Sequence, residues 1–308
     1  MENVFRVAAV VAPILVTVYL GMLCRRKNLI TPEGVQGLQQ FVLNIALPCV
    51  VFNSILTAKV SAQSLAVMAL MLPFMLGTTL WSFRSGKKKF PYRNLPMLFC
   101  ARESGMLGIP LFMILFGSEQ VYHMVILDLV QAIFFHPTVA ILSSDTGDGP
   151  NAGEILKKVL KSPLVIMVLI ALGLNLSGLG TLLQSSAGQV VTETMAFLGQ
   201  PVSVLMIFCV GYNLSFSGSN RSDIFKLSLI HVFTFAVIAG LLQLLLFLLP
   251  DITVLTRWAI LLYCFLPTSY FAPILGRTGQ EKTVASGVCS LTTAVTLVAF
   301  CIIAALTA

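Results

Sequence analysis

The segment CARESGMLGIPLF, residues 100–112, places charged side chains and helix breakers inside one apolar run. The residues concerned are Arg102, Glu103, Ser104, Gly105, Gly108 and Pro110. A planar guanidinium can clamp a carboxylate through two parallel hydrogen bonds. A neighbouring buried carboxylate can take up a proton, bind the amino group of a zwitterion, or pair with another helix. The segment therefore predicts a substrate site for a small anion, with Glu103 as an ion-coupling candidate.

The composition indicates an integral membrane protein. The chain has 308 residues, of which 57% are hydrophobic and 10% charged, and its mean hydropathy is +0.94. Seven cysteines lie in apolar runs, which indicates packing residues and predicts no disulfide framework and no metal site. The net charge of +7 comes from short gaps between apolar runs, so it is an orientation signal and predicts no nucleic-acid partner.

Apolar runs of about 20 residues match the helix length that crosses a bilayer core. They predict an all-α protein with about ten transmembrane helices, at roughly 4–23, 35–56, 64–84, 95–117, 120–142, 162–180, 189–212, 223–249, 256–277 and 283–306. Most of the 19 Lys and Arg residues fall in alternate gaps, which the positive-inside rule assigns to the cytoplasm. We therefore expect an inner-membrane protein with both termini outside.

The chain divides near its middle. Residues 143–161 combine turn formers with a short amphipathic stretch and predict a cytoplasmic linker between the five-helix halves 1–142 and 162–308. An odd number of helices per half inverts the second half. Prolines recur at similar offsets, in the pairs Pro13 and Pro163, Pro48 and Pro201, and Pro110 and Pro267. These features predict two inverted repeats, an architecture of secondary transporters.

Two helices are predicted to unwind within the membrane and cross each other. In the fourth span the breakers are those of residues 105–110, and in the ninth they are Pro267, Pro273 and Gly276. A half-helix that starts at such a break directs free N–H groups into a cavity and favours an anion. Thr268, Ser269 and Tyr270 follow Pro267 and are predicted to join the substrate site.

Other polar residues lie within apolar spans. Asp128 is an ion-coupling or supporting candidate with Arg102 as its counter-charge, and His136 and His231 are interpreted as packing residues. Hydroxyls on one face of the tenth span are expected to line the cavity, coordinate a cation or help helices pack: Ser286, Ser290, Thr293 and Thr296. Asn44, Pro48 and Pro201 are assigned scaffold or hinge roles.

Four stretches resemble the auxin efflux carrier family, whose bacterial members include malate and malonate permeases. They are GMLCRRKNLITPEGVQGLQQFVLNIALPCVVFNSIL (21–56), SGMLGIPLFMILFG (104–117), LGQPVSVLMIFCVGYNL (198–214) and 267–297. The resemblance implies ten helices in two inverted repeats, with helices 4 and 9 crossing. It further implies that helices 1, 2, 6 and 7 form a scaffold and dimer surface past which helices 3–5 and 8–10 move, and that the substrate is an organic anion.

The chain departs from the family at one point. Where the family commonly has Gly-Asn, this sequence has Arg102 and Glu103. We therefore expect a secondary transporter of a small mono- or dicarboxylate, with an amino-acid or other zwitterion carrier as the alternative. An enzyme or sensor ranks lower, because the H-E-x-x-H and G-x-S-x-G motifs are absent. We expect no cofactor; coupling to H⁺ or Na⁺, the exact substrate and the direction of transport stay open.

Overall fold

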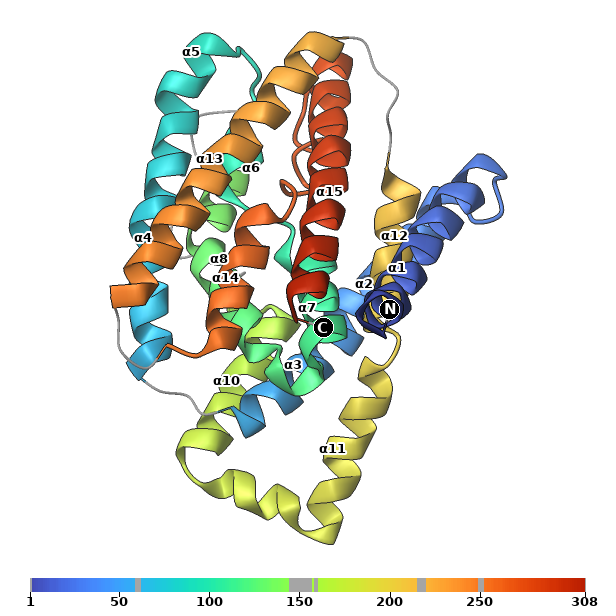
Figure 1. Ribbon diagram of the computed structural model, residues 1–308, viewed down its shortest axis with the longest axis vertical. Coiled ribbons are helices and arrows are strands. Elements are labelled where there is room, and N and C mark those ends of the chain that lie inside the picture. Colours follow the sequence, from blue (N-terminus) through green and yellow to red (C-terminus); the bar gives the residue numbers. More distant parts are fainter. Residues whose placement is uncertain are drawn as a thin grey trace.

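The computed structural model describes residues 2–58, 62–143, 157, 160–214, 220–248 and 252–307, and within them every regular element is a helix (Figure 1). In the first half these are α1 (Glu2–Arg26), α2 (Pro32–Phe41), η1 (Val42–Ala46), α3 (Leu47–Thr57), α4 (Ala62–Trp81), η2 (Ser82–Gly86), α5 (Lys87–Lys89), α6 (Met97–Cys100), η3 (Ser104–Gly108), α7 (Ile109–Phe116), η4 (Ser118–Gln120) and α8 (Tyr122–Ser143). In the second they are α10 (Pro163–Leu176), η5 (Leu179–Gln184), α11 (Ser186–Gly199), α12 (Val202–Asn213), α13 (Arg221–Leu248), α14 (Val254–Phe265) and α15 (Gly279–Thr307).

Among the described residues, six helical stretches are long and apolar enough to cross a membrane, which confirms the all-α membrane class. They are Val7–Arg26, Pro32–Thr57, Ala66–Arg84, Gly188–Asn213, Arg221–Leu248 and Gly279–Thr307. The expected fourth and ninth spans are interrupted and leave the shorter apolar helices Ser104–Phe116 and Val254–Phe265. The expected fifth and sixth spans are α8 and the 14-residue α10. The ten-helix inverted-repeat arrangement stays a prediction, and most of the predicted linker 143–161 lies outside the described residues.

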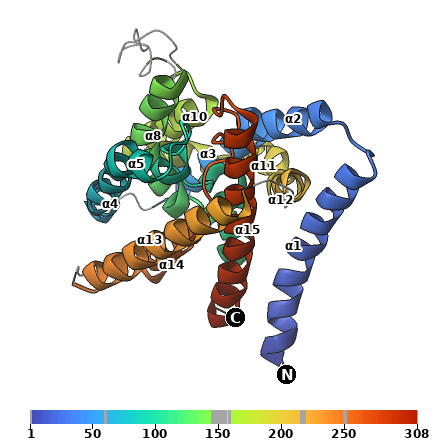
Figure 2. The same ribbon diagram turned by 90° about the horizontal axis from the view of Figure 1, so that it is seen from above.

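The helices pack in two groups, and the first group pairs helices from opposite halves of the chain. In one group α1 packs on α12, and α3 packs on α10 and α11. In the other, α4 packs on α8, and α13 packs on α14 and α15. Figure 1 shows α10 and α11 at the end of the molecule opposite α5, and Figure 2 gives the view from above. The groups meet where α12 contacts η3 and α7, and where α3 contacts η4.

Glycine allows α1 and α12 to touch backbone to backbone. A Cβ added to Gly21 would lie 2.2 Å from the Phe208 carbonyl oxygen, and one added to Gly211 would lie 2.2 Å from the Val18 carbonyl oxygen. In a bilayer, close approach of small residues is a main source of helix association. This contact therefore fixes the first helix against the second half of the chain.

We expect Gly21→Leu to separate α1 from α12 and to lower the free energy of unfolding by about 1–3 kcal/mol, the usual cost of overpacking. Thermal unfolding of the purified protein in detergent measures the loss. Gly240→Leu is the matched control, because a Cβ at Gly240 meets no atom within 4 Å. Equal melting temperatures for both variants would contradict the close contact.

Side chains fix the loop that leads into α6. The amide nitrogen of Asn94 donates to the carbonyl of Ala272 at 2.8 Å, and the N–H of Arg93 donates to Glu281 Oε1 at 2.7 Å. The hydroxyl of Tyr92 donates to Asp223 Oδ2 at 2.5 Å, and burial together with this carboxylate raises the pKa of Tyr92. The start of α6 is thereby tied to α13, to α15 and to the segment before α15.

Prolines within the predicted spans occupy different local settings. Pro48 and Pro110 each lie at the start of a helix that follows a π-helical turn. In the wider turn the hydrogen-bond partners are shifted, so the N–H that proline lacks is not needed there. Pro201 instead precedes α12, at the point where α11 ends. Pro13 lies inside α1, whereas Pro163 begins α10. Members of the proline pairs used as repeat markers therefore do not share a local conformation.

Candidate functional site

The fourth span is interrupted before the glycines and proline that were expected to break it. The residues outside a helix are Ala101 to Glu103, with Ala101 extended at φ −143° and ψ 148°. Gly105 and Gly108 lie inside the π-helical turn η3, and Pro110 lies in the first turn of α7. The expected position of the break is thus wrong by a few residues. Gly108 has another role, because a Cβ there would lie 2.5 Å from Leu266 Cδ1.

The ninth span is interrupted at Pro267, as expected. Proline keeps the preceding residue out of the helical region, and Leu266 is extended at φ −64° and ψ 151°. The half-helix that was expected after this break is not regular: residues 270–275 form turns, and α15 begins only at Gly279. Pro273 and Gly276 lie at the two ends of a turn, in which the Gly276 N–H donates to the Pro273 carbonyl at 3.3 Å.

The two interruptions meet through their backbones. Arg102 and Thr268 form an isolated antiparallel bridge, and the N–H of Glu103 donates to the Pro267 carbonyl at 3.0 Å. The carboxylate of Glu103 then accepts a hydrogen bond from the Tyr270 N–H at 2.7 Å. At each break, backbone N–H and C=O groups lack partners within a helix. The two breaks supply hydrogen-bond partners to each other, as is required where water is excluded. The predicted juxtaposition of residues 102–108 with 267–270 is present.

Gln131 on α8 holds the first interruption in place. Its Oε1 accepts hydrogen bonds from the Arg102 N–H and the Tyr263 hydroxyl, both at 2.8 Å. Its Nε2 lies 3.0 Å from the Arg102 carbonyl and 2.8 Å from Asp128 Oδ1. Asp128 also accepts a short hydrogen bond from the Ser104 hydroxyl. Asp128 therefore contacts Ser104 and Gln131, in place of the counter-charge expected from Arg102.

Arg102 is buried, with 2% of its surface exposed. Its guanidinium carbon lies 3.3 Å from the ring centroid of Phe235, and Nη1 contacts His231 Nε2. His231 Nδ1 lies 3.0 Å from the Leu98 carbonyl, so that nitrogen carries the proton and Nε2 is the acceptor. The side chain thus packs against α13. His231, interpreted from the sequence as a packing residue, is its partner.

A cavity of about 420 Å³ lies between the two groups of helices, beside the crossing. On one side it is lined by Gln36, Gln39, Gln40 and Leu43 of α2 and η1, with Asn213 and Leu214 at the end of α12. On the other side it is lined by Met106, Tyr270, Phe271, Pro273, Ile274, Ser286, Cys289 and Ser290. None of these lining residues carries a charge. Tyr270 joins the cavity to the crossing, since its N–H is held by Glu103.

The hydroxyls of the tenth span divide between the cavity and the protein interior. Ser286 and Ser290 line the cavity. Thr293 Oγ1 lies 2.9 Å from the Tyr270 hydroxyl oxygen, and Thr296 Oγ1 lies 2.5 Å from the Phe265 carbonyl oxygen. The two threonines therefore hold α15 against the ninth-span interruption. Ser269 is buried, and its carbonyl lies 3.6 Å from Cys289 Sγ.

Several lining residues were not predicted. Gln36, Gln39 and Gln40 are spaced three and one apart, which puts three amides on one face of a helix in an otherwise apolar run. That spacing is a usable signal for a polar cavity wall. Asn213 ends α12 and has no comparable signal. Asn44 is exposed on η1, and its scaffold role, with those of Pro48 and Pro201, stays a prediction.

Comparison with known proteins points in one direction. A family described as membrane transport protein matches residues 7–304 of the chain. A curated relative from Methanothermobacter thermautotrophicus, described as an uncharacterized transporter, is 28% identical over 206 residues. The match covers 61% of this chain and 66% of the relative, so the chain spans just under two thirds of the relative's length.

Proposed function

We propose that this chain, which belongs to the membrane transport protein family, is a secondary transporter of a small organic anion. Membership in this family agrees with the resemblance found in the sequence motifs. The family and the apolar helices together support a multi-pass membrane transporter. The observation that supports the finer proposal most is the cavity of about 420 Å³ between two packed groups of helices, next to two interrupted helices that cross. Its size falls within the range of small-molecule sites.

The chemistry of the cavity supports an anionic substrate. The amides of Gln36 and Gln39 and the hydroxyl of Ser286 can donate hydrogen bonds to a carboxylate without adding charge. Met106, from the first turn of the segment 104–116, also lines the cavity, so the positive end of that helical segment lies beside it. Arg102 adds a buried positive charge behind the crossing.

The packing supports an elevator-type movement. Helices α1–α3 and α10–α12 would form the scaffold that the resemblance assigns to transmembrane helices 1, 2, 6 and 7. Helices α4–α8 and α13–α15 would form the moving part. The exchange of partners, α1 with α12 and α3 with α10, is what two inverted repeats would produce. We further propose a homodimer in the inner membrane with both termini outside, and coupling to H⁺ or Na⁺ through Asp128 or Glu103.

The amino-acid carrier is the second candidate, because Glu103 lies next to the cavity. Its carboxylate is engaged by the Tyr270 N–H, and this favours the anion over a substrate with an ammonium group. An enzyme has no support from the described residues that line the cavity, which include no histidine and no carboxylate.

Uptake of labelled malonate and malate into proteoliposomes tests the function. We expect saturable uptake that unlabelled dicarboxylates compete and amino acids do not, and a pH jump or removal of sodium then identifies the coupling ion. The cavity variant Gln39→Leu is expected to weaken uptake. The control Gln243→Leu is expected to leave uptake unchanged, because the Gln243 amide donates to the Arg257 carbonyl and does not line the cavity. Competition by amino acids alone would select the second candidate.

Arg102 provides a separate prediction. Arg102→Met keeps the length and apolar packing of the side chain but removes its charge, so we expect a folded protein whose apparent affinity for dicarboxylate falls about tenfold, or 1.4 kcal/mol. Arg102→Lys keeps the charge without the planar stacking on Phe235 and should lie between Met and wild type. Uptake kinetics of the three proteins measure the effect. Unchanged kinetics in Arg102→Met would show that the charge does not act on substrate.

A further inference from the structure

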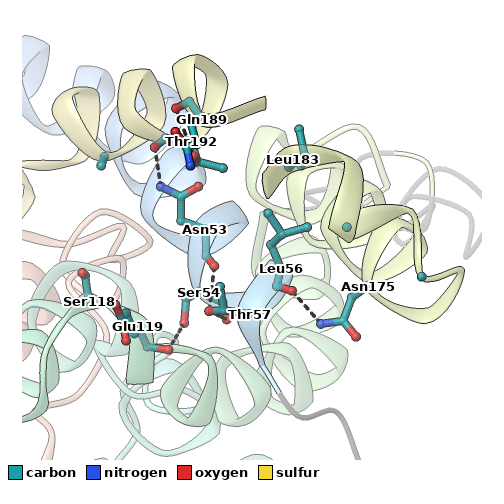
Figure 3. A pocket seen from close by; sticks show the side chains of 13 residues that line it. Asn53, Ser54, Leu56, Thr57, Ser118, Glu119, Asn175, Leu183, Gln189 and Thr192 are labelled. Atoms are coloured by element: carbon teal, nitrogen blue, oxygen red, sulfur yellow. Dashed lines mark hydrogen bonds between the residues drawn. The ribbon is translucent and has the colours of Figure 1, made fainter. Parts of the chain in front are cut away.

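A second cavity, of about 700 Å³, lies at the C-terminal end of α3, at the end of the molecule occupied by α10 and α11 (Figures 1 and 3). Its lining shares no residue with the cavity beside the crossing. The residues that line it come from α3, η4, the α10 end, η5 and α11: Asn53, Ser54, Leu56, Thr57, Ser118, Glu119, Asn175, Gly178, Gly180, Leu183, Gln189, Thr192 and Ala196. Eight of these thirteen residues carry polar side chains.

Three helices end at this cavity. Thr57 is the last residue of α3, Ser118 and Glu119 follow the end of α7, and Asn175 lies in the last turn of α10. The C-terminus of a helix carries a partial negative charge from its unpaired carbonyls. Helix α11 presents its side, through Gln189, Thr192 and Ala196. The helix ends therefore make the cavity attractive to a positive charge.

Glu119 adds a full negative charge. It is exposed at the cavity and is the only charged residue among the described residues that line it. An anion in this cavity would meet one carboxylate and three negative helix ends. The cavity is therefore unsuited to the carboxylate substrate proposed above, and its ligand is a different one.

Most hydrogen-bond donors of the lining are already directed at protein carbonyls. The bonds run from Asn53 Nδ2 to Thr192 at 2.9 Å, from Asn175 Nδ2 to Ile55, Leu56 and Ala58 at 2.9 Å, from Ser54 Oγ to Glu119 at 3.0 Å, from Thr192 Oγ1 to Gln189 at 3.1 Å, and from Thr57 Oγ1 to Asn53 at 3.2 Å. Ser54 Oγ also accepts from the Tyr122 N–H at 2.8 Å. Acceptor oxygen stays available to a ligand at the Glu119 carboxylate and at the lone pairs of the threonine hydroxyls.

We propose that this cavity binds a small organic cation with N–H donors, a primary ammonium compound. The positive charge of the ligand is attracted by the helix ends and by Glu119, and its ammonium hydrogens can donate to the unused acceptors. The volume suits an organic molecule, since pockets for small molecules occupy about 300–1,000 Å³. A bare metal ion fits less well, because the described residues hold no group of three His, Cys, Asp or Glu that could bind one.

Binding to the purified full chain in detergent, measured by isothermal titration, tests the proposal with two probes of equal charge. Ethanolamine carries three ammonium hydrogens, whereas choline carries none. We expect ethanolamine to bind at least fivefold more tightly than choline. Glu119→Gln should weaken ethanolamine about fivefold, the effect of an exposed ion pair worth about 1 kcal/mol. Glu33→Gln removes a charge from the first turn of α2 and should leave binding unchanged.

Ala196→Phe places a ring in the cavity and should weaken ethanolamine binding without touching Glu119. Equal binding of ethanolamine and choline, full binding by Ala196→Phe, or competition by malonate in place of ammonium would each overturn the proposal. All readouts measure binding and none measures uptake. A failure of the transport proposal therefore leaves this test intact, and the reverse also holds.

Discussion

Replacing Glu103 by leucine is expected to abolish uptake and to lower the free energy of unfolding by about 1–3 kcal/mol. The cost arises because the N–H of Tyr270 loses the carboxylate that accepts its hydrogen bond at 2.7 Å. A buried donor left without a partner pays its full desolvation penalty. Tyr270 lines the cavity, and its hydroxyl lies 2.9 Å from Thr293 Oγ1. A displacement of Tyr270 would therefore disturb both the cavity and α15.

Glu103→Gln separates the two roles of the carboxylate. Glutamine keeps an oxygen for the Tyr270 N–H but cannot ionise, so we expect nearly wild-type stability. Uptake by this variant then reports on charge alone. If Glu103 carries a coupled proton, Glu103→Gln will exchange substrate across the membrane without concentrating it. The melting temperature measures stability, and substrate accumulation driven by a pH gradient measures coupling. Loss of stability equal to that of Glu103→Leu would contradict the hydrogen-bond role.

The meeting of the two interrupted helices could be predicted because proline leaves a sequence signal that depends little on context. Pro267 forces Leu266 out of the helix, and the chain breaks where the prediction placed it. The fourth-span break was misplaced because glycine has two uses. Gly108 was interpreted as a helix breaker, but its lack of a Cβ serves the contact with Leu266. A contact with a residue more than 150 positions away leaves no local signal.

Side-chain partners were predicted less well than backbone breaks. Arg102 and Asp128 are both intramembrane charges, and their pairing was the simplest expectation. The structure gives Arg102 the ring of Phe235 and a nitrogen of His231, and gives Asp128 the Ser104 hydroxyl. Which partner a buried group finds depends on helix rotation and crossing, which periodicity does not determine.

Gln131 shows the same limit and carries the second large effect. Gln131 was not among the site residues predicted from the sequence, yet it is 7% exposed and bonds both backbone groups of Arg102. Those groups belong to an extended residue between α6 and η3, so no helix supplies them with partners. A single amide side chain therefore replaces part of the hydrogen-bond ladder that the interruption removes.

Gln131→Leu is expected to lower the free energy of unfolding by about 3 kcal/mol or more, because it orphans the N–H and the carbonyl of Arg102 together in a buried site. We expect a drop in melting temperature and complete loss of uptake, since the crossing can no longer hold Glu103 against Pro267. Tyr263→Phe is the matched control: it removes only the hydroxyl that donates to Gln131 Oε1 and should cost about 1 kcal/mol. Equal losses in the two variants would mean that the shared bond to Tyr263, and not the backbone of Arg102, is what Gln131 contributes.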